Sequence, residues 1–366
     1  MSDASTHHFI EMYMDEASAP MYLSGFFQSP PRNFHTSEKV DIDIVRDDEE
    51  VAIAIQDLSV GARENESTLY VNKAFAPPIF DEAGTITAYN LAKRRPGQNP
   101  FDDPDYAKNA MEEAFAIFRK LERKIRRAVE LMCAQVLQTG KVTCRDKAGN
   151  ALFTLDFQAR PTHFPTAANA WGGGSAAIIA DISGLADTIR ANGRKVPTKL
   201  IFGSRAWQDF IADPVILKLL ETRRADFGLI SPGAGLVGAP TSRGEGATYN
   251  GYIWIGQYKY ELWTYSATYR DPVTGNHVPY VNQDSVIILS DQTRLDLTFG
   301  AIPFVRKPDQ EALAFLPPRL SSGDRGLDLT TNVWFTPDNR HLKTSAGTRP
   351  LPIPTAIDAF GCLKTR

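Results

Sequence analysis

The chain has 366 residues, of which 43% are hydrophobic and 23% are charged, so a sizeable buried core is expected. Its formal net charge of −3 argues against a protein that wraps nucleic acid with its whole surface. Three cysteines, Cys133, Cys144 and Cys362, form neither a metal-ligand spacing nor an even-numbered disulfide framework, so we expect reduced thiols in a cytoplasmic protein.

Residues 1–35 form a mixed segment that is interrupted by prolines near its end, in "QSPPRNF". The segment lacks the basic and then apolar layout of a signal peptide, and no run of eighteen apolar residues occurs in the chain. We therefore expect an extended arm rather than a domain, and no contact with a membrane.

A long hairpin is predicted over residues 36–80. The stretch "KVDIDIV" alternates apolar and acidic residues, which is typical of a strand, and "VAIAIQ" and "TLYVNKAF" are further candidates. The polar tip between the last two has too few large apolar residues to pack by itself. A two-stranded ribbon is marginal in water, so this one is expected to lie on another surface. The candidate tip residues are Asp57, Gly61, Arg63 and Glu64.

A long amphipathic helix is predicted from Pro104 to about Thr139. Asp103 suits the N-cap, Pro104 suits the first helical position, and Gly140 supplies a stop. Apolar residues recur at spacings of three and four and form one stripe. At about 1.5 Å per residue the helix would span roughly 50 Å.

The back of this helix carries a concentrated positive charge, which we call the basic face. It consists of Arg119, Lys120, Arg123, Lys124, Arg126 and Arg127. Three interpretations are open: a solvated face, a sequence-independent contact with phosphates, or a partner for acidic residues. The chain itself supplies acidic candidates for this partner role over residues 41–50. The last four residues of that segment are Asp47, Asp48, Glu49 and Glu50.

The remaining chain mixes helices and strands, which indicates an α+β protein. A hairpin is predicted after the long helix with its turn at 146–150, then a helix that ends at Asn192-Gly193. A buried strand at 200–202, an N-cap at Ser204 and two short helices broken at Pro214 follow. Strand candidates then lead to a proline-rich tail.

No motif indicates catalysis or a bound group. "WGGGS" at 171–175 precedes a helix but lacks the lysine of a phosphate loop, so we favour a flexible loop there. The histidines have neither metal nor triad spacing, and the acidic run 41–50 lacks the glycine of a calcium loop. We expect no enzyme, no cofactor and no metal.

Five segments of the chain carry a resemblance to a known family. They are, in this order, "FFQSPPRNFHTSEKVDIDIV", "LAKRRPGQNPFDDPDYAKNA", "LIFGSRAWQDFIADPVILKLLETRR", "TYNGYIWIGQYKYELWTYSATY" and "RPLPIPTAIDAF". The order of the predicted elements resembles that of the major capsid proteins of tailed bacteriophages, and the five segments resemble the lambda-type branch, the phage major capsid protein E family. The likeness covers most of the chain.

The resemblance implies the Johnson fold of tailed-phage shells. On that template the chain would divide into an N-terminal arm (1–35), an extended loop over a neighbour (36–80), a peripheral domain with the long spine helix at about 104–139 (81–194), an axial domain (195–310) and a return to the peripheral domain (311–366).

The resemblance also implies a shell protein that self-assembles into hexamers and pentamers around packaged double-stranded DNA. The expected partners are further copies of the chain, a scaffolding protein, a portal and a decoration protein, with non-specific DNA contact open. We expect assembly in the host cytoplasm, residence in the virion and no covalent crosslink. The basic face is expected to meet a neighbour's loop rather than DNA. Two alternatives are an encapsulin-like compartment and an unrelated α/β enzyme.

Overall fold

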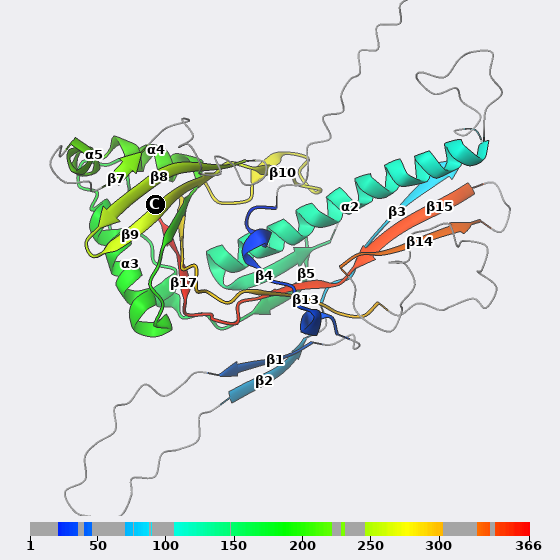
Figure 1. Ribbon diagram of the computed structural model, residues 1–366, viewed down its shortest axis with the longest axis horizontal. Helices are drawn as coiled ribbons and strands as arrows, with labels where there is room; N and C mark the ends of the chain where they lie inside the picture. The colour runs from blue at the N-terminus through cyan, green and yellow to red at the C-terminus, as the bar shows by residue number, and fades with distance from the viewer. Residues whose placement is uncertain are drawn as a thin grey trace, which may run out of the picture.

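The structure of the protein is a computed structural model (Figure 1). It describes residues 21–35, 40–45, 70–75, 77–87, 89, 106–146, 148–221, 228–230, 246–302, 328–336 and 341–366. Two packed regions make up the molecule, one built on the long helix and one on a six-stranded sheet.

The long helix α2 (Tyr106–Thr139) is the axis of the first region. Its predicted apolar stripe is buried at Leu121, Ile125, Val129 and Met132. The helix ends where the sequence predicted, because Gly140 adopts a φ of 67° that other residues rarely take. Asp103 and Pro104, the predicted start, lie outside the described residues.

A three-stranded antiparallel sheet lies along α2, as Figure 1 shows. Its order is β14-β15-β3, with bounds Thr330–Phe335, His341–Thr348 and Phe80–Thr87. Helix and sheet approach closely at Gly84, where a Cβ atom would overlap the side chain of Ile117 on α2. The glycine therefore sets the distance between helix and sheet.

The second region is a six-stranded sheet in the order β17-β12-β6-β9-β8-β7. Only the β6–β9 pair is parallel. Helices α3 (Ile178–Gly193), α4 (Ser204–Ala212) and α5 (Pro214–Glu221) supply the core on one face. The strands run over Phe360–Lys364, Ser285–Leu289, Lys199–Phe202, Tyr258–Tyr265, Ala247–Ile255 and Gly228–Ile230.

The other face of this sheet packs against the C-terminal half of α2 and residues 22–27, so one core joins the two regions. Strands β6 and β12 are covered on both faces. This explains the continuous apolar runs at 200–202 and 286–289, because a strand buried on both sides has no polar side to alternate.

Four two-stranded sheets complete the described architecture. The predicted hairpin is the pair β4–β5, and the Asp146 carboxylate accepts hydrogen bonds from the backbone N–H of Ala148 (2.8 Å) and Asn150 (2.9 Å) in its turn. The pairs are β1–β2 (Val40–Val45, Tyr70–Phe75), β4–β5 (Lys141–Arg145, Ala151–Asp156), β10–β11 (Thr268–Arg270, His277–Pro279) and β13–β16 (Asp296–Phe299, Pro350–Ile353).

One local prediction needs correction. The cap of α4 is Gly203 rather than Ser204. Residue 203 is a glycine because it lies so close to the Asn282 carbonyl that no side chain would fit. The predicted loop at 171–175 is a loop in the structure, and its first residue is anchored, because the Trp171 indole is fully buried and its Nε1 donates to Asp181 Oδ2 at 3.0 Å. Helix α3 packs in the same core as the six-stranded sheet.

The tail contributes strands to both regions. Strands β14, β15 and β16 lie with α2 and its sheet, whereas β17 pairs with β12 in the six-stranded sheet. Periodicity predicts a strand but not its partner, so the sequence alone did not indicate this pairing. The predicted domain boundaries stay predictions.

Candidate functional site

The basic face of α2 is partly solvated and partly paired within its own chain. Arg119, Lys120 and Lys124 are exposed, whereas Arg123, Arg126 and Arg127 are half-buried. The apolar stripe opposite them packs on the core. The helix is therefore amphipathic as predicted, with its apolar stripe buried and its basic residues exposed or half-buried.

Arg126 has a specific partner that the sequence did not suggest. Its Nη1 and Nη2 atoms donate to the two carboxylate oxygens of Asp328 at 2.6 and 2.5 Å. Glu122, one turn earlier on α2, lies 3.5 Å from Nη2. Partial burial lowers the pKa of Arg126, but the hydrogen bonds and charge of Asp328 raise this pKa by more than burial lowers it. The pKa of Arg126 therefore lies above its ordinary value.

Lys124 is paired as well, because its Nζ donates to Glu82 of β3 at 2.9 Å. This pair is about half exposed and contributes little stability by itself. At least two of the six basic residues thus neutralise acids of their own chain. Their acidic partners, Glu82 on β3 and Asp328, lie outside the acidic segment 41–50 that the sequence analysis considered.

The acidic candidates and the loop tip are not among the described residues. Asp47, Asp48, Glu49 and Glu50 follow β1 directly, and Asp57, Gly61, Arg63 and Glu64 lie between β1 and β2. Their proposed roles stay predictions.

The ribbon that carries them is paired as a two-stranded sheet. Strands β1 and β2 are antiparallel, with Val40 opposite Phe75 and Val45 opposite Tyr70. In the described part of the chain neither strand has a second strand neighbour. Figure 1 shows the pair extending away from the body below β13. Its root is anchored, because Val40 is buried in the central core.

Glu130 is a buried carboxylate on α2 that the sequence analysis missed. Its side chain is fully buried, and it accepts hydrogen bonds from the backbone N–H of Leu23 (2.7 Å), the backbone N–H of Ser24 (2.8 Å) and the Tyr265 hydroxyl (2.8 Å). One sequence signal could have found it, because Glu130 is the lone charge between Arg127 and Lys141. A lone acid in an apolar stretch needs partners when buried.

The environment of Glu130 disfavours its charge. Burial raises the pKa of Glu130, and the hydrogen bonds from Ser24, Leu23 and Tyr265 oppose that shift without cancelling it. Burial and the nearby carboxylate also raise the pKa of Tyr265. Glu130 therefore links three elements, namely α2, β9 and the short helix η1 (Ser24–Phe26).

The segment around η1 is built into the body of the protein. The Tyr22 ring lies 5.4 Å from the rings of both Trp263 and Tyr265. Further along, the backbone N–H of Gln28 donates to the Leu295 carbonyl and that of His35 to the Phe299 carbonyl. Residues 28–35 thus line β13. The predicted N-terminal arm stays a prediction, because residues 1–20 lie outside the described part of the chain.

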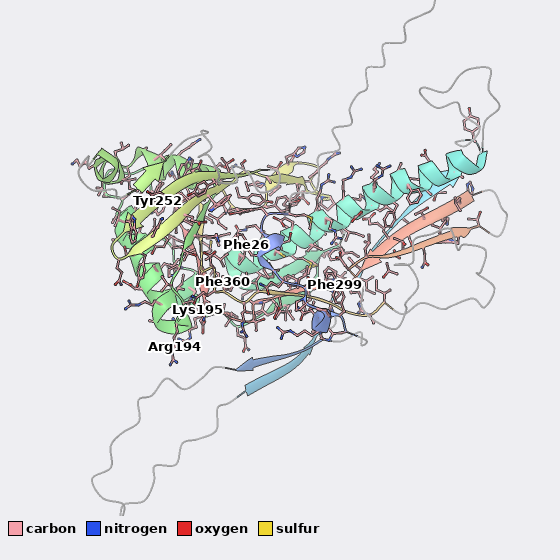
Figure 2. All side chains as sticks on the ribbon, viewed as in Figure 1. Phe26, Arg194, Lys195, Tyr252, Phe299 and Phe360 are labelled. Atoms are coloured by element: carbon pink, nitrogen blue, oxygen red, sulfur yellow. The ribbon has the colours of Figure 1, made fainter. Side chains whose placement is uncertain are left out.

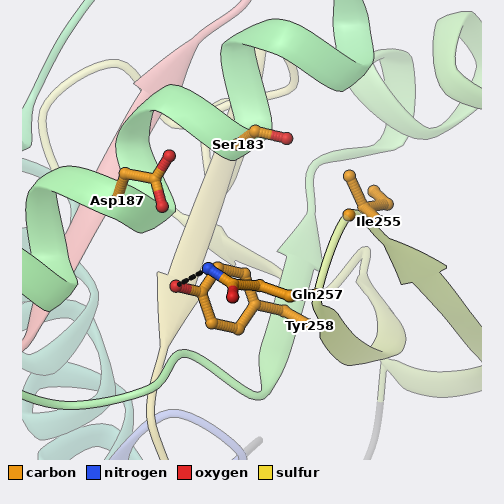
Figure 3. Close-up of a pocket in the computed structure, with 6 residues that line it drawn as sticks. Ser183, Asp187, Ile255, Gln257 and Tyr258 are labelled. Atoms are coloured by element: carbon orange, nitrogen blue, oxygen red, sulfur yellow. Dashed lines mark hydrogen bonds between the residues drawn. The ribbon is translucent and has the colours of Figure 1, made fainter.

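One surface pocket of about 280 Å³ lies between α3 and the β8–β9 turn. Figure 3 shows Ser183 and Asp187 on one side and Gln257 and Tyr258 on the other, where Gln257 Nε2 donates to the Tyr258 hydroxyl at 2.8 Å. Among the described residues, no group of three His, Cys, Asp or Glu side chains could hold a metal ion. No described helix is long and apolar enough to cross a membrane.

Comparisons with known proteins give a consistent result. The family described as phage major capsid protein E matches residues 16–364. A prophage protein of E. coli CFT073, assigned as a capsid protein, is 17% identical, with 81% of this chain and 79% of that chain covered and a TM-score of 0.57. No curated protein matches the chain.

Two further solved structures are similar at lower scores. An encapsulin complex from Synechococcus elongatus PCC 7942 is 10% identical, with 96% of this chain and 89% of that chain covered and a TM-score of 0.46. Gordonia phage Cozz is 9% identical, with 95% and 87% covered and a TM-score of 0.45. The prophage likeness shows the fold, which is the α+β Johnson fold that the sequence resemblance implied.

Proposed function

The chain belongs to the phage major capsid protein E family and is a structural shell protein of the virion rather than an enzyme; from this premise we propose that it assembles into hexamers and pentamers that close an icosahedral shell around double-stranded DNA. Each subunit contributes many modest contacts, whose sum stabilises the closed surface. The family match favours the phage shell over the encapsulin alternative.

The observation that carries the proposal is the incomplete ribbon. Strands β1 and β2 pair with each other and, in the described chain, with no third strand. A two-stranded ribbon is marginal by itself, and apolar area that it buries on a neighbour would stabilise it at roughly 25 cal/mol per Å². A neighbouring subunit is the surface that supports it.

The basic face has a narrower role in this proposal than the sequence suggested. Arg126 and Lys124 hold acids of their own chain. We assign the contact with a neighbour's acidic segment, Asp47 to Glu50, to the same face, on which Arg119 and Lys120 are exposed. Opposite charges across such a contact favour the correct register between identical subunits. The packaged DNA is the alternative partner of this face.

The remaining partners follow from the family. A scaffolding protein, a portal and a decoration protein would act with the shell, assembly would take place in the host cytoplasm, and contact with the packaged DNA would be independent of sequence.

Deletion of Asp57–Ser67 tests the proposal. The subunit should stay folded, because β1 and β2 retain their pairing and the core lies elsewhere, but shells should be absent in negative-stain micrographs. Circular dichroism and thermal unfolding of the variant check the fold.

A matched variant carries a Gly-Ser linker of equal length in place of Asp57–Ser67. It restores the reach of the loop but not its side chains. If both variants form shells as readily as the unmodified protein, the extended loop is not an assembly element.

A further inference from the structure

Four of the ten large apolar side chains that are exposed in the described part of the chain lie in two patches of the six-stranded-sheet region. The first, the aromatic face, consists of Tyr252, Trp254 and Lys259 on the β8–β9 hairpin. Trp254 is 40% exposed, and Lys259 Nζ lies 4.2 Å from the centre of the Tyr252 ring. Trp254 stands opposite Lys259 in the strand register, so the three side chains share one face.

The chain itself covers another part of that face. Nearer the sheet centre, Tyr22 lies on Trp263, and Phe26 lies beneath Lys199. Figure 2 shows Phe26 beside α2 and Tyr252 well to its left on β8. The cover formed by the N-terminal segment therefore does not prevent solvent contact at Trp254, and an apolar surface continues outward from the core.

The second patch, the apolar knuckle, is the corner between α4 and α5. Its exposed residues are Ile211, Ala212, Pro214, Val215 and Leu217. Exposed fractions of 39% for Ile211, 53% for Val215 and 45% for Leu217 are high for aliphatic side chains. Scattered apolar residues on a surface are ordinary, but an apolar run at one corner marks a contact site.

The knuckle is held in a defined shape. Asp213 Oδ1 accepts hydrogen bonds from the backbone N–H of Val215 (2.8 Å) and Ile216 (3.1 Å), which caps the start of α5. Phe210 and Ile216 point inward and are fully buried. The corner thus presents its apolar side chains on a backbone that is fixed by the cap and by two buried residues, which lowers the cost of binding.

The two patches point in opposite directions. Phe210 and Ile216 pack in the same core cluster as Ile253 and Ile255, so α4 and α5 cover that face of the sheet. Trp254 lies between these two isoleucines in β8, and alternation places it on the other face. A surface on each side of one domain suits head-to-tail contact, which closes into a ring when the rotation per subunit allows.

We propose that the apolar knuckle of one copy packs on the aromatic face of the next copy, and that this head-to-tail contact builds the ring of subunits. The inference rests on the proposed function, because a shell protein meets copies of itself at high local concentration. It names which two surfaces meet. Proline and aliphatic side chains that pack on the ring of Trp254 would bury apolar area between the two copies.

A cysteine pair tests the contact. Val215→Cys and Trp254→Cys in one chain should give, after mild oxidation of assembled particles, a ladder of covalent oligomers up to the ring size on a denaturing non-reducing gel. Each single variant should give no ladder. The pair Leu152→Cys with Trp254→Cys is the matched control, because Leu152 is 75% exposed on a different hairpin and should not be linked.

Several outcomes would overturn the inference. Shells that form without a ladder, a crosslink confined to one chain, or covalent dimers alone would each show that the knuckle does not meet the aromatic face of the next copy. A second protein or residues 231–245 would then be the occupant. An unmodified chain that forms neither rings nor shells would instead overturn the proposed function.

Should the cysteine pair itself block assembly, single alanine variants decide the matter. Trp254→Ala should weaken ring formation at least tenfold in sedimentation experiments, whereas Leu152→Ala should leave it unchanged. Equal behaviour of the two variants would contradict the proposal.

Discussion

At the scale of single residues, Glu130 determines how the N-terminal segment is held. The carboxylate has no cationic partner among its hydrogen bonds, and two adjacent backbone N–H groups and one hydroxyl satisfy it. A side chain one hundred residues away in sequence thus acts as the cap of η1. The cost of burying the charge is visible in the raised pKa of Glu130.

Glu130→Ala should destabilise the subunit by about 2–4 kcal/mol at pH 7.5, because three buried donors lose their acceptor. Urea unfolding of the unassembled subunit measures the loss. The matched control is Glu122→Ala on the same helix, which removes only a half-exposed ion pair at 3.5 Å and should cost less than about 1 kcal/mol.

The stability difference between the unmodified protein and Glu130→Ala should depend on pH in a defined direction. The pKa of Glu130 is raised above its unfolded value of 4.5, so its proton stabilises the folded state below that pH, and this contribution is lost as pH rises through the folded pKa. The advantage of the unmodified protein over Glu130→Ala should therefore be larger at pH 4 than at pH 7.5. A smaller advantage at pH 4 would mean that the fold prefers the charged carboxylate.

At the scale of elements, the approach of α2 to its sheet depends on one missing side chain. Gly84 on β3 faces Ile117, which is half-buried on α2, and a Cβ atom at residue 84 has no room. The stripe of α2 and the strand pattern of β3 are each visible in the sequence. The distance between α2 and β3 is not visible in the sequence, since it depends on which residues of the two elements meet.

Gly84→Val should destabilise the subunit by about 1–3 kcal/mol through overpacking. Addition of Ile117→Ala should recover part of that loss, and a double-mutant cycle measured by urea unfolding gives the coupling. Thr85→Val on the neighbouring exposed position should change stability by no more than about 0.5 kcal/mol. Absence of coupling between Gly84 and Ile117 would refute the close approach.

At the scale of the whole molecule, charge is distributed between contacts inside the subunit and contacts proposed between subunits. Arg126 with Asp328 and Lys124 with Glu82 join α2 to other elements of the same chain. The basic face is also proposed to act in assembly, where exposed charges affect register and rate more than affinity.

Arg123→Glu with Arg127→Glu should impair shell assembly, and Asp47→Lys with Glu50→Lys in the same chain should restore part of it. Light scattering during assembly at low and high salt measures both, with weaker effects at high salt because of screening. Arg126→Glu is the control, since it should lower subunit stability and gain nothing from the lysines. If the lysines restore no assembly, the basic face contacts solvent or DNA rather than a neighbour's acidic segment.

The sequence by itself determined the local elements and the family. Period-two alternation marked β1, three- and four-residue spacing marked α2, and Gly140 marked its end, because these signals depend only on neighbouring residues. The tertiary structure alone decided that β17 joins β12, that Arg126 binds Asp328, and that Glu130 caps η1. Such pairings join residues far apart in the chain, and local patterns carry no information about which distant partner the folded core will bring near.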